Sequence, residues 1–533
     1  MNLEKRLQFI IFCLSAVFFL PFLGAVPLFD WDEINFAECA REMLMLDEYL
    51  KVYINYQPFW EKPPLFIWFQ AISMSIFGIN EYAARLPNAI CGILTLQILF
   101  LMGKKLYHAK FGFWWAICYL GSILPHFYFK TGIIDPVFNL FIFLGIYFFL
   151  LFYWKKEQFE IELSKKPLFY LIISGIFIGL AILTKGPVAY LIFGLCLFVF
   201  WILQKFKLFI SIPHFLLFSV ICGLPMLLWI GVETLKNGTW FLEEFIKYQI
   251  RLFQTKDAGH GGFFGYHFVV LLFGCFPISF FALFRLFKNT EKTDFQRNFM
   301  LFMQILFWVI LVLFSVVSTK IVHYSSMAYF PISFLGTLFV WQMIENKISV
   351  PNSLKISLLV FSIILGAVVF ALPFVGQNLD SLKDLIKDDF AKANFSAQVD
   401  WHWSDGWAGI YLILLLISVL FLFHFQKINW AFQMLFVGMA VMMMGTLSVF
   451  PNIERYTQAA ALDFFRTLQN KDVYVTTIGY KSYAHLFYAK IPVSSRPNTN
   501  DGYEWTKFLL HCFFNKKMFL CKNSKTKNSD ADR

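Results

Sequence analysis

The sequence predicts an all-α polytopic membrane protein with about 13 transmembrane helices. Three observations lead to this fold class. Of the 533 residues, 59% are hydrophobic and only 15% are charged, whereas soluble domains have about 45–50% and about 25%. The 70 phenylalanines are too many for a surface that faces water. Apolar runs of about 20 residues, the length that crosses a bilayer, recur along most of the chain.

The formal net charge of +11 does not indicate a nucleic-acid-binding surface. Most lysines and arginines lie in short connectors between apolar runs, where they orient a membrane protein and attract anionic lipids. The nine cysteines have no zinc-site spacing, and most lie inside apolar runs. Cys512 and Cys521 lie in a polar tail, where a disulfide is one alternative in an oxidising compartment.

The first apolar run, Leu7–Phe29, is too long for a signal peptide, so we expect an uncleaved helix. Thirteen crossings put the N-terminus and the basic connectors on the cytoplasmic side, and the C-terminus on the opposite side. The further spans are expected at Leu86–Leu106, Phe111–Phe129, Pro136–Trp154, Leu168–Leu183, Pro187–Leu203, Leu208–Val232, Tyr266–Phe287, Asn298–Val317, Ile321–Met343, Leu354–Val375, Ala408–Phe425 and Trp430–Phe450.

The long segments all fall on the outer side of this arrangement. The first outer loop, Asp30–Arg85, contains two stretches, Glu33–Leu46 and Leu65–Gly78, that we expect to be interfacial helices. The chain therefore divides into a transmembrane domain, residues 1–450, and a C-terminal domain, residues 451–533, that caps the outer face.

The residue pattern of the C-terminal domain is typical of a small α/β unit. Its polar and apolar residues alternate in patterns typical of helices and strands, in an order that mixes the two. Helices are expected at Arg455–Leu468 and Tyr480–Tyr488, and strands at Asp472–Thr477 and Met518–Cys521.

Three acids lie within four residues at the start of the first outer loop: Asp30, Asp32 and Glu33. Asp32 begins the first interfacial helix, so one interpretation is an N-cap that accepts helix-end N–H groups. Acids at a membrane boundary are costly unless they face water, a cation or a substrate. Asp32 is therefore also a candidate site residue.

A rigid Glu61-Lys62-Pro63-Pro64 segment precedes the second interfacial helix. Pro63 holds Lys62 extended, and Pro64 suits the first turn of the helix. A fixed ammonium at the water–lipid boundary suits a lipid-linked phosphate. The alternative is a snorkelling lysine paired with its neighbour Glu61.

Further ionisable residues reach the same outer face from other spans. Asp135 opens a span as an Asp-Pro pair, which is also an N-cap signal. Lys185 and Lys320 lie at outer ends of spans, against the positive-inside tendency. Snorkelling explains each lysine alone, but together these residues indicate a cluster of cations and acids on one leaflet.

The loop from Tyr248 to Tyr266 contains Arg251, a histidine and several glycines. This composition is typical of a mobile segment that closes over a bound group, or of an ordinary solvated loop. No P-loop, dinucleotide fingerprint, zinc-protease motif or serine nucleophile elbow is present in the sequence.

Five motifs stand out, at Asp32–Leu44, Trp60–Leu65, Glu81–Pro87, Leu183–Pro187 and Ser318–Tyr324. Together they resemble the lipid A aminoarabinose transferase family, part of a wider group of polyprenyl-phosphate-dependent glycosyltransferases that includes the protein O-mannosyltransferases. The resemblance implies a GT-C type fold in the bacterial inner membrane. It also implies transfer of a sugar from undecaprenyl phosphate to a lipid A-type or other acceptor in the periplasm, where the C-terminal domain would lie.

The resemblance also implies roles for individual residues. Asp32 and Asp135 correspond to the catalytic carboxylates, and Glu61 would orient Lys62. The remaining residues would bind the lipid phosphate and the sugar. These are Lys62, Arg251, Tyr324, Lys185, Lys320 and His323. Asn35 stands where the family often has arginine, and Tyr248-Gln249 replace an acidic residue and a histidine.

A polyprenyl phosphate is already a good leaving group when cations neutralise its charge, so no nucleotide or redox cofactor is required. A divalent metal bridging carboxylates and phosphate is an alternative for which the sequence assigns no ligands. The competing functions are a protein O-glycosyltransferase, a multi-span transporter and a structural protein. A transporter would have inverted repeats and ionisable residues near the bilayer midplane, whereas these acids lie in outer loops and at span ends.

Overall fold

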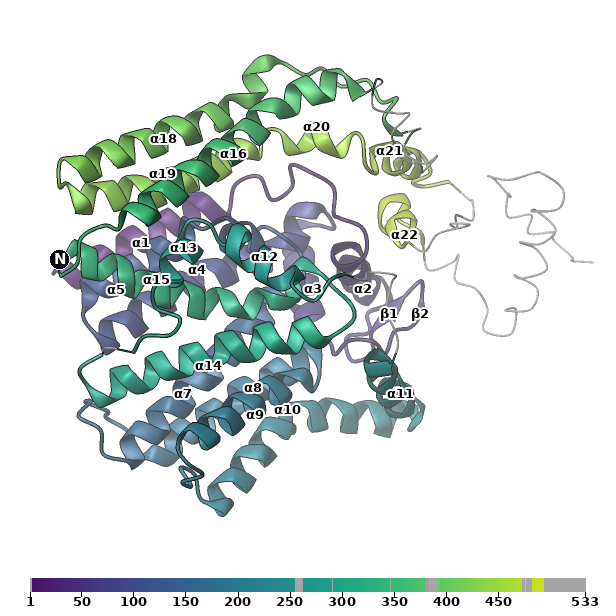
Figure 1. The fold of residues 1–533 in the computed structure, drawn as a ribbon. Helices are drawn as coiled ribbons and strands as arrows, with labels where there is room; N and C mark the ends of the chain where they lie inside the picture. The colour runs from purple at the N-terminus through teal and green to yellow at the C-terminus, as the bar shows by residue number, and fades with distance from the viewer. Residues whose placement is uncertain are drawn as a thin grey trace, which may run out of the picture.

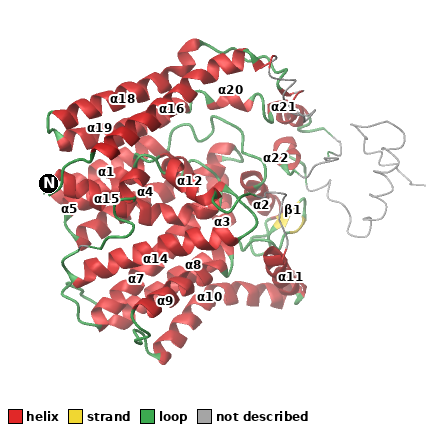
Figure 2. Ribbon diagram, in the orientation of Figure 1, coloured by secondary structure: helices red, strands yellow, loops and turns green. Residues whose placement is uncertain are grey.

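The computed structural model describes residues 2–254, 262–289, 291–345, 347–379, 381, 392, 394–471, 475 and 482–492. Helices make up most of this part of the chain (Figure 2). Its one sheet is an antiparallel pair of two-residue strands, β1 (Tyr53–Ile54) and β2 (Gln57–Pro58). The predicted all-α class is therefore confirmed for the described residues.

Nine helices in the described residues are long and apolar enough to cross a membrane. The chain is thus a multi-span membrane protein, as predicted. These helices are α4 (Glu81–Leu106), α7 (Asp135–Lys156), α8 (Pro167–Lys185), α10 (Ile212–Asn237), α14 (Asp294–Val316), η1 with α15 (Val322–Ile344), α16 (Asn352–Gln377), η3 with α18 (Trp403–His424) and α19 (Ile428–Thr446).

The predicted number of 13 crossings is not confirmed, because the other predicted spans are short or interrupted helices. Pro277 separates two short helices where one span was expected, since its ring and missing N–H end a helix. Gly121 and Ser122 interrupt another predicted span. The short helices are α1 (Leu3–Phe19), α5 (Ala109–Leu120), α6 (Ile123–Tyr128), α9 (Val188–Leu203), α12 (Tyr266–Gly274) and α13 (Ile278–Ala282).

Small residues let neighbouring helices approach closely, as is common in membrane proteins. The clearest case joins α4 and α5, where Gly103 faces Gly112. A Cβ atom at Gly112 would lie 2.2 Å from the carbonyl oxygen of Phe100. Larger residues at this contact would therefore push the two helices apart.

The outer-loop elements gather at one end of the helix bundle, and the N-terminus lies at the other end (Figure 1). The two helices predicted in the first outer loop are present as α2 and α3. The elements at this end are α2 (Asp32–Leu46), α3 (Leu65–Phe77), the β1–β2 pair, α11 (Trp240–Gln254), α20 (Phe450–Glu454), α21 (Ala459–Thr467) and α22 (Ala484–Ala489).

The tail is only partly described. The helix predicted at Arg455–Leu468 is present as α21, and the one predicted at Tyr480–Tyr488 begins only at Ala484. The Ser482 hydroxyl accepts the Ala484 N–H just before that helix begins. Both predicted strands lie outside the described residues except for position 475, and Cys512 and Cys521 lie outside them as well. The division at residue 450 stays a prediction.

A buried ion pair joins the first outer loop to the bundle. The Arg85 guanidinium on α4 donates to both carboxylate oxygens of Glu33 on α2, at 2.7 and 3.1 Å. Both side chains are only 2% exposed. Arg85 also donates to three backbone carbonyls, those of Leu23, Val26 and Pro27, each at 2.8 Å. The pair therefore fixes the chain on both sides of Asp30.

A second buried pair joins the tail to the same helix. Arg41 on α2 donates to Glu38 at 2.6 Å and to the carbonyl oxygen of Ile491 at 3.1 Å. The Tyr56 hydroxyl donates to the same carbonyl at 2.6 Å. The Leu28 N–H donates to the hydroxyl of Tyr488 at 2.7 Å. The described part of the tail is thus packed against the first outer loop.

We expect Arg85→Gln to destabilise the protein strongly, because it leaves Glu33 buried without its charge partner. Removing one member of a buried pair costs about 3–5 kcal/mol. The melting temperature of the purified protein in detergent measures the effect. The matched control is Arg297→Gln, since Arg297 forms an exposed pair with Asp294, a type worth about 0–1 kcal/mol. Equal melting temperatures for the two variants would contradict the role of the pair.

Candidate functional site

Asp32 opens α2 toward a cavity of 540 Å³. Helix α2 begins at Asp32 because Trp31, with φ at 72°, turns the chain sharply just before it. The Asp32 carboxylate makes no capping hydrogen bond, so the N-cap interpretation is wrong. Its side chain is 40% exposed and contacts the imidazole of His323 instead.

Asp135 also makes no capping hydrogen bond, although it opens α7 and Pro136 follows it. Its Oδ1 accepts a hydrogen bond from Nζ of Lys185 at 2.6 Å. Lys185 is the last residue of α8, and Gly186 with φ at 95° ends that helix. The Asp135 side chain is 4% exposed and the Lys185 side chain 17%. Asp135 therefore forms a largely buried ion pair with Lys185, and the alternative interpretation of Asp135 as a helix cap is wrong.

His323 joins the two carboxylates. Its Nε2 lies 3.2 Å from Oδ2 of Asp32 and 3.8 Å from Oδ2 of Asp135. The Lys185 ammonium lies 5.3 Å from the ring centre of Tyr324, a cation–π distance. Residues from α2, α7, α8 and η1 thus meet at one point, which confirms the convergence that the sequence analysis expected.

Lys62 and Glu61 line the same cavity as Asp32. Burial and the nearby charge of Lys185 lower the pKa of Lys62 from its usual value. Burial raises the pKa of Asp32, but the contact with His323 and the positive charges of His323, Lys62 and Lys185 outweigh it and lower this pKa to about 2. Asp32 is therefore ionised at physiological pH.

Lys320, a predicted substrate-binding residue, is not part of this cluster. The Lys320 ammonium donates to the carbonyl oxygens of Phe314, Ser315 and Val317, at 2.6 to 2.9 Å, and so satisfies the C-terminal end of α14. Lys320 does not line the cavity. Arg251 belongs to α11, but its side chain lies outside the described residues, as does the chain from residue 255 to 261.

Several lining residues were not identified from the sequence, above all the tyrosines Tyr128, Tyr329 and Tyr483. Tyr128 lies in an apolar run, where a tyrosine usually belongs to the core, so no feature of the sequence distinguished it. In the structure this hydroxyl accepts a hydrogen bond from Asn139 at 2.6 Å, and Asn139 also donates to Ser326 at 2.8 Å. This bridge holds η1, and with it His323, against α7. Tyr483 comes from the tail, and no local sequence signal places it here.

Among the described residues, no group of three or more His, Cys, Asp or Glu side chains has the arrangement to hold a metal ion. No metal ligands are therefore assigned. Seven cysteines lie in the described part, and all of them are free.

The chain matches one family model, named dolichyl-phosphate-mannose-protein mannosyltransferase, over residues 61–229. This stretch includes Lys62, Asp135 and Lys185. The match begins at Glu61, so it leaves out Asp32 and covers about a third of the chain.

Two relatives share a name, undecaprenyl phosphate-alpha-4-amino-4-deoxy-L-arabinose arabinosyl transferase. The protein from Wigglesworthia glossinidia brevipalpis is 26% identical over 347 residues, which cover 62% of this chain and 59% of the relative. The protein from Photorhabdus laumondii is 25% identical over 272 residues, which cover 50% of this chain and 47% of the relative. The match thus spans about half the length of these relatives.

The crystal structure of ArnT from Cupriavidus metallidurans bound to undecaprenyl phosphate has the same fold. Its TM-score is 0.72 at 16% identity, and the match covers 91% of this chain and 84% of ArnT. The apo structure of the same protein gives a TM-score of 0.73. The resemblance to the lipid A aminoarabinose transferases, with the protein O-mannosyltransferases as wider relatives, is therefore confirmed in sequence and in fold.

Proposed function

We propose that this protein is a glycosyltransferase that moves a sugar from an undecaprenyl-phosphate-linked donor to an acceptor at the outer face of the bacterial inner membrane. The observation that carries the proposal is the network of Asp32, His323, Asp135 and Lys185 beside a cavity lined by Lys62. The names of its relatives support undecaprenyl phosphate as the donor lipid. They also support 4-amino-4-deoxy-L-arabinose as the sugar. Lipid A is proposed as the acceptor from the motif resemblance described in the sequence analysis.

The reaction needs little beyond charge stabilisation. The bond between the anomeric carbon and the phosphate oxygen breaks, and the phosphate keeps the electron pair. The charges of Lys62 and Lys185 both act on Asp32, so these lysines would also stabilise the charge that develops on the leaving group. An acceptor oxygen then forms the new bond to the anomeric carbon.

The low pKa of Asp32 argues for an electrostatic role. A general base works best when its pKa lies near the operating pH, whereas the pKa of Asp32 is lowered to about 2. Its negative charge is suited to stabilising the positive charge that develops on the sugar ring. An acceptor phosphate, already anionic, would need no base. Asp135, paired with Lys185, would hold that lysine in place.

Protein O-glycosylation is the second candidate, because the matched family model carries the name of a protein mannosyltransferase. Serine and threonine hydroxyls must lose a proton during transfer, so this reaction would need a base. The pKa of Asp32 favours the phosphate acceptor over a hydroxyl. Similarity to transferases over 62% of the chain favours an enzyme over a transporter.

We expect Asp32→Asn to lower kcat by about 100- to 1,000-fold, the usual effect of removing one electrostatic stabiliser. The assay uses purified protein in vesicles, with undecaprenyl phosphate-α-4-amino-4-deoxy-L-arabinose as donor and lipid A as acceptor. The variant should still bind undecaprenyl phosphate. Asp47→Asn is the matched control, since Asp47 is an exposed residue at the C-terminal end of the same helix.

Two outcomes of this assay would count against the proposal. Wild-type protein that leaves lipid A unmodified but glycosylates a serine- or threonine-containing peptide would establish the second candidate. Full activity of the Asp32→Asn protein would show that the charge of Asp32 takes no part in the reaction.

We also expect His323→Ala to raise the pKa of Asp32 from about 2 toward or above its usual value of 3.8, because burial then acts with fewer opposing charges. A carboxyl C=O band, assigned by its loss in the double variant with Asp32→Asn, should appear in infrared spectra at about pH 4. Wild-type protein should lack this band, because Asp32 stays ionised until the pH falls toward its pKa of about 2. The stability that ionised Asp32 contributes is lost over the same low pH range. His402→Ala, an exposed histidine, is the control. An unchanged Asp32 titration would refute this coupling.

A further inference from the structure

The segment that carries His323 and Tyr324 is a short 3-10 helix, η1 (Val322–Ala328). A 3-10 helix has three residues per turn, so side chains three positions apart lie on the same face. His323 and Ser326 therefore share one face of η1. Tyr324 and Ser325 lie on the other two faces, so each of the three can contact a different part of the bundle.

The face of η1 with His323 lies in register against α7. Asp135 and Asn139 are four positions apart on α7, so they also share one face of their helix. Nε2 of His323 lies 3.8 Å from Oδ2 of Asp135. Three residues further along η1, the Ser326 hydroxyl accepts a hydrogen bond from the Asn139 amide at 2.8 Å. The contact with Asn139 thus sets the register in which His323 meets the carboxylates.

Ser326 also links Asn139 to the backbone of His323. The Ser326 hydroxyl donates to the carbonyl oxygen of His323 at 2.5 Å. Asn139 is itself fixed, because its amide also donates to the Tyr128 hydroxyl at 2.6 Å. The side chains of Asn139 and Ser326 are almost fully buried. A buried polar group that loses its partner costs free energy, so these contacts hold each other in place.

A second face of η1 is held by α12. Nδ1 of His267, on α12, lies 3.0 Å from the Ser325 hydroxyl, and both residues are fully buried. On the third face, the Tyr324 ring packs against Phe314 of α14, with the ring centres 5.6 Å apart. A rotation of η1 about its axis would break the contacts with α7 and α12 together. These two contacts therefore fix the direction in which His323 points.

We propose that Asn139 and His267 are positioning residues for the transfer reaction. They act through the two serines of η1 and hold His323 between the two carboxylates of the site. The inference rests on the proposed function and deepens it. Neither residue lines the cavity that Asp32 faces, so each acts through the placement of His323 and not by touching the substrate.

The test removes the amide of Asn139 with little change of volume. Asn139→Leu should lower kcat about 10- to 100-fold in the vesicle assay, because a misplacement of about 1 Å can cost about 100-fold in rate. The Asp32 carboxyl band should also appear in infrared spectra at about pH 4, since the contact with His323 lowers the pKa of Asp32 more than either nearby lysine does. A merely structural residue would not move this titration.

Asn298→Leu is the matched control. Asn298, on α14, is also buried, and its side chain accepts a hydrogen bond from Nε1 of Trp154 at 2.8 Å. Trp154 lies at the opposite end of α7 from Asp135. The same substitution there removes one buried hydrogen bond between α7 and another helix. It should lower the melting temperature but leave kcat and the Asp32 titration unchanged.

Two further variants keep the test informative if Asn139→Leu does not fold. Ser326→Ala removes the hydroxyl at the centre of the first contact, and His267→Phe keeps a ring but removes the contact between α12 and η1. Each should raise the pKa of Asp32. Added to His323→Ala, neither should raise it further, because substitutions that act through the same group are not additive.

The outcomes separate the two proposals. Wild-type protein without transfer activity would refute the proposed function, and the infrared titration would still test the placement of His323. Active wild-type protein with an unchanged kcat in Asn139→Leu would overturn the inference alone, as would an unchanged Asp32 titration in any of the three variants that folds. An equal shift in Asn298→Leu would also overturn it, because the effect would then not depend on η1.

Discussion

The ion pair between Glu33 and Arg85 is the interaction on which the rest of this end of the helix bundle depends. It joins α2 to α4, and the same guanidinium holds three carbonyls of the segment that precedes Asp30. Both charges are almost fully buried. Such a pair is costly to break because either partner alone would remain desolvated. The start of α2, and therefore Asp32, is fixed by this constraint.

The candidate site also contains a largely buried ion pair, but only one of its two carboxylates belongs to that pair. Asp135 and Lys185 neutralise each other, whereas Asp32 faces His323 and an open cavity. The two carboxylates thus have different surroundings although each opens a helix. Lys62 and Lys185 add positive charge beside Asp32, which keeps it ionised. An anionic leaving group and an electron-poor sugar carbon are the species that this charge distribution would stabilise.

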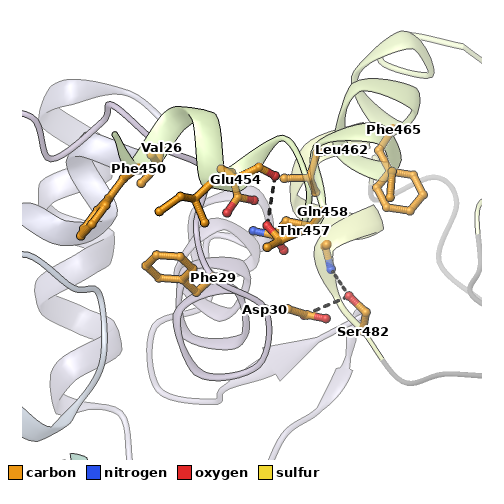
Figure 3. A pocket seen from close by; sticks show the side chains of 13 residues that line it. Val26, Phe29, Asp30, Phe450, Glu454, Thr457, Gln458, Leu462, Phe465 and Ser482 are labelled. Carbon is orange, nitrogen blue, oxygen red and sulfur yellow. Dashed lines mark hydrogen bonds between the residues drawn. The ribbon is translucent and has the colours of Figure 1, made fainter. Parts of the chain in front are cut away.

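Two cavities at the same end of the helix bundle share Phe29 and Asp30 but differ in the rest of their linings. The first contains Lys62, Asp32 and His323, while the second has an apolar lining with Glu454 and Asp30. The lining of the second cavity comes from Val26, Phe29 and Asp30 and from residues of α20, α21 and α22, which are more than 400 residues further along the sequence (Figure 3). The hydrogen bonds from Leu28 to Tyr488, and from Gln458 to the Leu28 carbonyl, hold these segments together. Packing of the tail therefore shapes the second cavity.

The sequence by itself determined the helical class, the interfacial helices α2 and α3 and the group of Asp32, Lys62, Asp135, Lys185 and His323. Apolar runs and proline positions are local signals, so they can be read without tertiary contacts. Only the tertiary structure decided that Lys320 caps α14 while Lys185 pairs with Asp135, and that Glu454 and Tyr483 line cavities. Which carbonyl or carboxylate a lysine meets depends on how distant helices pack, and no local pattern records that.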